Sequence, residues 1–151
     1  MTTSIHVAAT LEALPDIRTF VATVAERAGL DRRAAYRLRL AVDEIATNIV
    51  VHGAASQAAG PEASIGLDAL IEPDRLTIVV EDSGVGFDPL AHHTPDEDDL
   101  KLPIGQRAIG GLGVFLAIRG VDEFRYERQG GMNRNVFVVR LVRPAEAPAK
   151  A

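Results

Sequence analysis

The chain of 151 residues contains no cysteine, which excludes disulfides, a thiolate nucleophile and a cysteine-ligated metal. No apolar run approaches the roughly 20 residues that a membrane-spanning helix needs. The first residues also lack the basic start and the apolar segment of a signal peptide. We therefore expect a cytoplasmic protein that makes no membrane contact.

Positive charge is scarce as well, because 16 Lys and Arg residues face 21 Asp and Glu residues and leave a net charge of −5. Nucleic acid binding rests on a basic surface, so this balance argues against it. A phosphorylated ligand would have to be held by backbone groups and a metal. The length and the 47% hydrophobic content indicate one domain with a core of ordinary size.

Apolar residues that recur at steps of three and four predict two helices, at 14–28 and at about 31–52. Gly29 is expected to end the first helix and Asp31 to cap the second. Gly53, followed by a loop of small residues, is expected to end the second helix.

Alternating apolar residues predict strands near 4–9, 63–69, 76–80, 123–127 and 137–141. A third helix is expected from 110 to 120. Between 88 and 109 no period is sustained, so this stretch is predicted to be a long mobile loop. Together these elements predict an α/β two-layer sandwich, with three helices in one layer and an antiparallel, possibly mixed, sheet in the other.

The second helix carries a polar stripe beside its apolar one, formed by Glu44, Asn48 and His52. Such a stripe can simply face water. Alternatively, the Asn48 amide oxygen can hold a metal while the Glu44 carboxylate accepts a proton from an attacking group. His52 is expected to have a structural role at the end of the helix.

Two glycine motifs suggest a ligand site. Asp82-Ser83-Gly84-Val85-Gly86 places an acid at the end of a buried strand, before a backbone that can turn tightly against a planar ligand. Gly110-Gly111-Leu112-Gly113 begins a helix and exposes N–H groups that suit phosphates. Taken singly, the first motif is also common turn chemistry and the second a common helix cap. A P-loop is excluded, because no glycine is followed by Lys-Ser or Lys-Thr.

In order and spacing, these motifs resemble the ATP-binding fold shared by gyrase, Hsp90, histidine kinases and MutL. The segments that carry the likeness are 41–48 (AVDEIATN), 81–89 (EDSGVGFDP) and 111–116 (GLGVFL). Within that superfamily the chain is most similar to serine/threonine kinases that act as anti-sigma factors, of the general-stress and sporulation type. The resemblance covers about residues 5–142.

This resemblance implies a sandwich of the Bergerat type with a mobile ATP lid. It assigns residues 1–143 to a histidine-kinase-like ATPase domain and leaves 144–151 as a disordered tail, which has too few large apolar groups to pack. Gly111, Leu112 and Gly113 would cradle the phosphates of ATP.

The other site residues also receive roles from the resemblance. Asn48 would ligate the Mg²⁺ that bridges the phosphates, and Glu44 would be the catalytic base that takes the proton from a serine hydroxyl. Asp82 would bind the amino group of adenine, while Gly84 and Gly86 would give the ring room.

Two departures from the family pattern stand out. Some kinase members have an arginine where this chain has Ile109, and the nearest candidate is Arg107 in the predicted loop. Near the last strand, where relatives commonly offer a threonine to adenine, this chain has Arg134-Asn135-Val136. ATP binding therefore rests on firmer ground than kinase activity.

The leading hypothesis is an ATP- and Mg²⁺-dependent serine kinase that regulates transcription by partner switching. Its implied partners are a sigma factor, an antagonist protein that it phosphorylates on serine, and a second copy of itself. An alternative is a nucleotide-binding adaptor that sequesters its partner without transferring phosphate. The catalytic domain of a histidine kinase is disfavoured, because no helical hairpin with an acceptor histidine precedes the domain.

Overall fold

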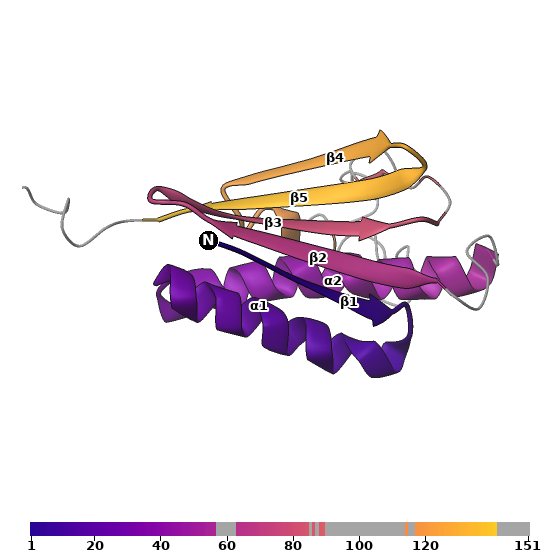
Figure 1. Cartoon of the computed structure of the whole chain (residues 1–151), viewed down its shortest axis with the longest axis horizontal. Coiled ribbons are helices and arrows are strands. Elements are labelled where there is room, and N and C mark those ends of the chain that lie inside the picture. Colours follow the sequence, from indigo (N-terminus) through magenta and orange to yellow (C-terminus); the bar gives the residue numbers. More distant parts are fainter. Residues whose placement is uncertain (57–62, 85, 87, 90–113, 115–116, 142–151) are drawn as a thin grey trace, which may run out of the picture.

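The computed structural model describes residues 1–56, 63–84, 86, 88–89, 114 and 117–141. Five strands form one sheet, and two α-helices lie side by side against one of its faces (Figure 1). In chain order the elements are β1 (Thr2–Ala8), the 3-10 turn η1 (Leu11–Ala13), α1 (Leu14–Ala28), α2 (Arg32–Ser56), β2 (Ser64–Ile71), β3 (Arg75–Asp82), β4 (Glu123–Gln129) and β5 (Met132–Arg140). The predicted α/β two-layer arrangement is confirmed.

The helix boundaries follow from local chemistry. Gly29 adopts φ 80°, a left-handed conformation that favours glycine, and it ends α1 as predicted. The Asp31 carboxylate accepts a hydrogen bond of 2.7 Å from the backbone N–H of Ala34, which confirms the predicted cap of α2.

The predicted end of α2 at Gly53 is wrong, because the helix runs on to Ser56. Two alanines follow Gly53, and alanine has the highest intrinsic helix propensity. A single glycine in a helix interior costs only about 1 kcal/mol, so good helix formers on both sides of it are enough to continue the helix.

The sheet has the strand order β1-β2-β3-β5-β4, and all four pairings between its described strands are antiparallel. The expectation that the sheet is mixed is therefore not supported by the strands that the structure describes. A two-residue turn joins β4 to β5, and Gly130 and Gly131 adopt φ 59° and φ 79° there. Positive φ at both turn residues matches the right-handed twist of the strands, which explains the glycine pair.

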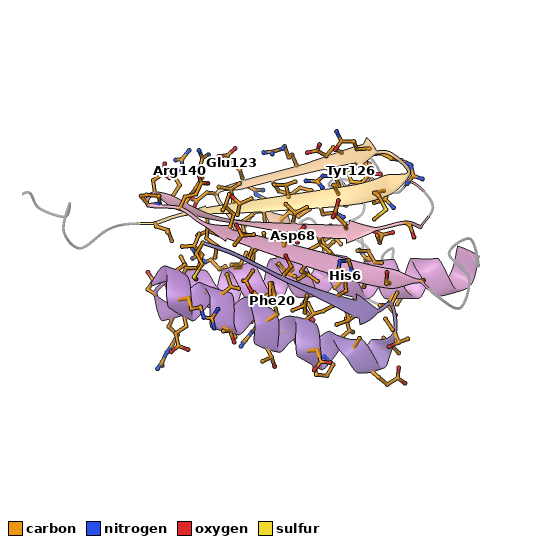
Figure 2. All side chains as sticks on the ribbon, viewed as in Figure 1. His6, Phe20, Asp68, Glu123, Tyr126 and Arg140 are labelled. Atoms are coloured by element: carbon orange, nitrogen blue, oxygen red, sulfur yellow. The ribbon has the colours of Figure 1, made fainter. Side chains whose placement is uncertain are left out.

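Strand alternation places the core between the sheet and the helices. On β3 the fully buried residues are Leu76, Ile78 and Val80, and on β5 Phe137 lies opposite Ile78. Phe20 of α1 lies between the helix layer and the sheet in Figure 2. These contacts fix the helices against one face of the sheet.

An ion pair links the two helices. The Arg18 Nε of α1 lies 2.7 Å from the Asp43 Oδ1 of α2, and the Arg18 Nη2 lies 3.5 Å from Oδ2. The Asp43 carboxylate therefore pairs with α1, while Glu44, the next residue, does not take part in this ion pair.

The third predicted helix falls largely outside the described residues. Within the described part, Val114 and Ala117 are helical and buried, and both join the core cluster. Among the described residues, no helix is both long and apolar enough to cross a membrane.

Phe137→Ala tests the centre of this core. Phe137 is fully buried and meets Phe124 edge to face, with ring centroids 5.1 Å apart. We expect the substitution to lower the free energy of unfolding by about 3–5 kcal/mol, as measured by urea denaturation. The control Leu70→Ala, at a residue 40% exposed, should change it by less than about 1 kcal/mol. Equal losses in the two variants would contradict the described packing.

Candidate nucleotide site

The site is built around the end of β3. Alternation along β3 directs Asp82 to the same face as Leu76, Ile78 and Val80, which is the face that the helices cover. Asp82 is only 6% exposed, although its position is one that a core residue would normally take. Burying a carboxylate is costly unless it is hydrogen-bonded, so the neighbours of Asp82 decide what it can do.

One oxygen of Asp82 is already occupied. Asp82 Oδ1 accepts a hydrogen bond of 2.9 Å from the Gly84 N–H and another of 3.1 Å from Asn133 Nδ2. Its Oδ2 receives no donor from the described residues. Asp82 is thus held in a fixed orientation with one acceptor left over, as the predicted contact with an amino group of a ligand requires.

The two glycines after β3 leave different amounts of room for a side chain. A Cβ at Gly84 would lie 2.9 Å from Asp82 Oδ1, and a Cβ at Gly86 would lie 3.2 Å from Arg128 Cδ. A side chain at Gly84 would therefore displace the carboxylate that the turn positions.

A cluster of polar residues on β4 and β5 holds Asp82, and the sequence analysis did not assign them to the site. Asn133 Oδ1 accepts hydrogen bonds from the Tyr126 hydroxyl and, at 2.9 Å, from Arg128 Nη1. Arg128 Nη1 also donates to the Gly84 carbonyl oxygen at 3.1 Å. Figure 2 shows Glu123 and Arg140 at one end of the sheet and Tyr126 part of the way along β4. The cluster fixes both the carboxylate and the backbone of the glycine turn.

Asn135 is a further residue that the sequence analysis left without a role. It is 3% exposed and lies between Val80 of β3 and Tyr126 of β4. Its buried Oδ1 accepts no hydrogen bond from any described residue. An unsatisfied buried acceptor costs about 1–3 kcal/mol, so this atom suits a donor that arrives with a ligand.

A signal for these residues was present in the strand pattern. Asn133 and Asn135 share the parity of Phe137, and Tyr126 and Arg128 share that of Phe124. Polar side chains at core-facing positions of adjacent strands indicate a polar pocket rather than a solvated surface.

The other side of the site is α2. Glu44 and Asn48 lie one helical turn apart and both are half-buried, as the sequence predicted. In Figure 1, α2 and β3 run in the same direction, so the C-terminal half of α2 and the end of β3 lie at the same end of the molecule.

Burial raises the pKa of the Glu44 carboxyl above its ordinary value, and the nearby charge of Asp43 raises it further. A raised pKa makes Glu44 a better proton acceptor near neutral pH than an ordinary glutamate.

The remaining predicted site residues lie outside the described part of the chain. These are Gly111, Leu112 and Gly113, together with residues 90–109 of the predicted loop. His52 lies on α2, but its side chain is not described.

The described residues contain no group of three or more His, Cys, Asp or Glu side chains that could hold a metal ion. Mg²⁺ does not require such a group, because it is often bound by one or two protein oxygens together with substrate phosphates. The Asn48 amide oxygen can supply one ligand of this kind.

The chain also matches a known protein family over most of its sequence. This match agrees with the acid at the strand end, the glycine turn and the polar stripe of the helix. Residues 7–140 match the family model of the histidine kinase-like ATPase domain, and the chain belongs to that family. It is similar to serine-protein kinase RsbW of Bacillus pumilus, with 31% identity over 121 residues that cover 77% of this chain and 72% of the relative. For RsbW of Bacillus subtilis the identity is 32% over 122 residues, with coverage of 77% and 71%. RsbW of Listeria monocytogenes serotype 4a is 31% identical over 120 residues, with coverage of 77% and 73%.

Glu44→Gln should change stability in a pH-dependent way. Because the folded state raises the pKa of Glu44, the charged carboxylate is less favourable in the folded protein than in the unfolded chain. The variant should therefore be more stable than wild type at neutral pH. This advantage should shrink as the pH falls through the raised pKa, and vanish below the ordinary carboxyl value.

Melting temperatures measured from acid to neutral pH test this expectation. Glu12→Gln, at an exposed carboxylate, is the matched control. A stability difference that does not vary with pH, or a variant less stable than wild type at neutral pH, would contradict the assigned environment of Glu44.

Proposed function

We propose that this chain is an ATP- and Mg²⁺-dependent serine kinase that acts as an anti-sigma factor in a partner-switching system. Its substrate would be a serine on an antagonist protein. Membership of the histidine kinase-like ATPase family supports ATP binding, and the relatives named serine-protein kinase support the reaction.

The observation that carries this proposal is a pair of acceptors at the end of the sheet, the unsatisfied Asn135 Oδ1 and the buried Asp82 carboxylate. Asp82 and Asn135 lie on adjacent, paired strands and face the same side. Adenine carries an exocyclic amino group with two hydrogens, which suits a pocket of acceptors. The Asp82–Asn133 contact and the glycine turn keep these acceptors in place before the ligand arrives.

Glu44 would supply the base. The serine oxygen would attack the γ-phosphorus, the bond from that phosphorus to the ADP oxygen would break, and Glu44 would take the hydroxyl proton. Asn48, one turn along the same helix, would hold the Mg²⁺ that neutralises the phosphate charge. The half-buried position of Glu44 favours this proton transfer, because its pKa is raised.

The same proposal includes the partners and the compartment. The chain would bind a sigma factor and the antagonist in turn, act as a homodimer, and work in the cytoplasm. A second candidate function is an ATP-binding adaptor that sequesters its partner without kinase activity. Ile109, at the position where some kinase members have arginine, favours it.

Glu44→Gln separates the two candidates. Loss of the base should lower phosphotransfer by about 10²- to 10⁴-fold, while ATP affinity stays near that of wild type. The assay is phosphoserine formation, with Mg-ATP, on an antagonist-type protein from the same genome. Glu26→Gln, at an exposed residue of α1, is the control. A wild-type protein that binds ATP but phosphorylates no antagonist would favour the adaptor.

Asn135→Leu tests the acceptor pair. Leucine has a similar volume and removes the unsatisfied buried oxygen, so the ligand-free protein should become more stable. ATP binding should weaken by about 1–3 kcal/mol, because a hydrogen-bond acceptor for the base is lost. Calorimetric titration with ATP and a thermal melt without it measure the two effects, and Thr77→Val on the opposite face of β3 is the control. Unchanged ATP affinity would remove Asn135 from the site.

A further inference from the structure

The N-terminal half of α2 carries an exposed surface that the nucleotide site does not use. We define the arginine face of α2 as Arg33, Tyr36, Arg37 and Leu40, with Arg32 and Arg39 beside it. All six side chains are exposed. Residues three and four apart lie on one side of a helix, so the four residues of the face form a continuous stripe.

The charge of this face contrasts with the rest of the chain. The protein has a net charge of −5, yet residues 32–42 contain four arginines and no acid. None of the four arginines forms an ion pair with a described residue. The nearest acid after them on α2, Asp43, is already bound to Arg18. Asp31, directly before Arg32, is engaged in the cap of α2. The arginines of the face and beside it therefore have no ion-pair partner among the described residues.

This arrangement works against the stability of the helix itself. Arg32 and Arg33 stand in the first turn of α2, where the helix dipole favours negative charge and where the capping Asp31 is the nearest acid. Arg33 and Arg37 are one turn apart, and like charges at this spacing repel. An acidic partner on this face would relieve both effects.

Apolar groups accompany the arginines. Tyr36 is 55% exposed and Leu40 is 40% exposed, and Arg39 stacks over the Tyr36 ring with its guanidinium carbon 5.7 Å from the ring centroid. Among the described residues six large hydrophobic side chains are exposed, and three of them, Tyr36, Leu40 and Val51, are on α2. Tyrosine and arginine are among the residues enriched at binding hot spots.

We propose that the arginine face of α2 is a docking surface for an acidic amphipathic helix of a partner protein. The acidic side chains of that helix would pair with Arg33 and Arg37, and its apolar side would cover Tyr36 and Leu40. Charge complementarity selects this occupant, because the face offers only positive and apolar groups.

A partner docked on the arginine face would lie close to the proposed catalytic base. This step of the inference rests on the proposed function. Leu40 and Glu44 are one turn apart on the same side of α2, and Arg37 precedes Glu44 by about 10 Å along the helix axis. A partner bound here is held beside the proposed base. The arginine face would therefore select acidic proteins as phosphate acceptors.

The double variant Arg33→Glu/Arg37→Glu tests the docking surface without requiring kinase activity. The probe is a synthetic amphipathic helix with glutamate on its polar side and leucine on its apolar side, and a twin with glutamine in place of glutamate is the matched peptide. Binding is measured by fluorescence anisotropy in the absence of nucleotide. Arg125→Glu is the control variant, since Arg125 lies on the sheet face away from the helices.

We expect the acidic peptide to bind the wild type and Arg125→Glu alike, to bind the double variant at least about tenfold more weakly, and to lose affinity as salt rises. The glutamine peptide should bind weakly to the wild type and to both variants. The double variant should melt at the same temperature as wild type or higher, because the helix dipole favours glutamate over arginine near the start of α2, and it should keep its ATP affinity.

Several results would overturn the proposal. These are no binding of the acidic peptide to wild type, equal binding to wild type and double variant, or equal binding of the two peptides. A lower melting temperature of the double variant with unchanged peptide binding would show that the arginines stabilise the fold instead. A short DNA oligonucleotide that binds wild type as tightly as the acidic peptide would show a general polyanion site. An absence of phosphotransfer would contradict the proposed kinase reaction but would leave this binding test intact.

Discussion

The hydrogen bond from Asn133 to Asp82 is the contact on which the site depends. It joins β3 to β5 on the face that the helices cover, and it orients a carboxylate that would otherwise be buried without adequate partners. Tyr126 and Arg128 support Asn133 from β4, and Arg128 also holds the carbonyl of Gly84. The end of β3 and a hairpin about 40 residues later in the chain therefore fix one acceptor and one turn together. A buried polar network of this kind stabilises a single arrangement only when its members are all in place.

Helix α2 combines three roles on its different sides. Its inner side supplies core residues such as Leu38, Val42 and Ile45, while its half-buried edge presents Glu44 and Asn48. Its outer side carries exposed arginines, which are unfavourable near the start of a helix. The core contacts of the inner side keep α2 folded despite its half-buried polar edge and its exposed arginines, because most helical stability in a folded protein comes from packing of the apolar side.

The fold could be predicted from the sequence to a large extent, because its elements depend on local patterns. The span of α1, the cap at Asp31 and the hairpin of β2 and β3 follow from periodicity and turn residues, and the structure confirms them. The end of α2 could not be predicted, since the propensity of the alanines after Gly53 competed with the glycine itself. The roles of Asn133 and Asn135 were also missed. Their importance comes from register, which sets Asn133 opposite Asp82 and which no single segment encodes.

The unpaired oxygen of Asn135 also has a consequence for the lifetime of the chain. A buried acceptor without a donor weakens the ligand-free fold, and any bound molecule that donates to it strengthens the folded state by mass action. Unfolded molecules are the ones that proteases remove. A molecule that donates a hydrogen bond to Asn135 would therefore also raise the abundance of the protein.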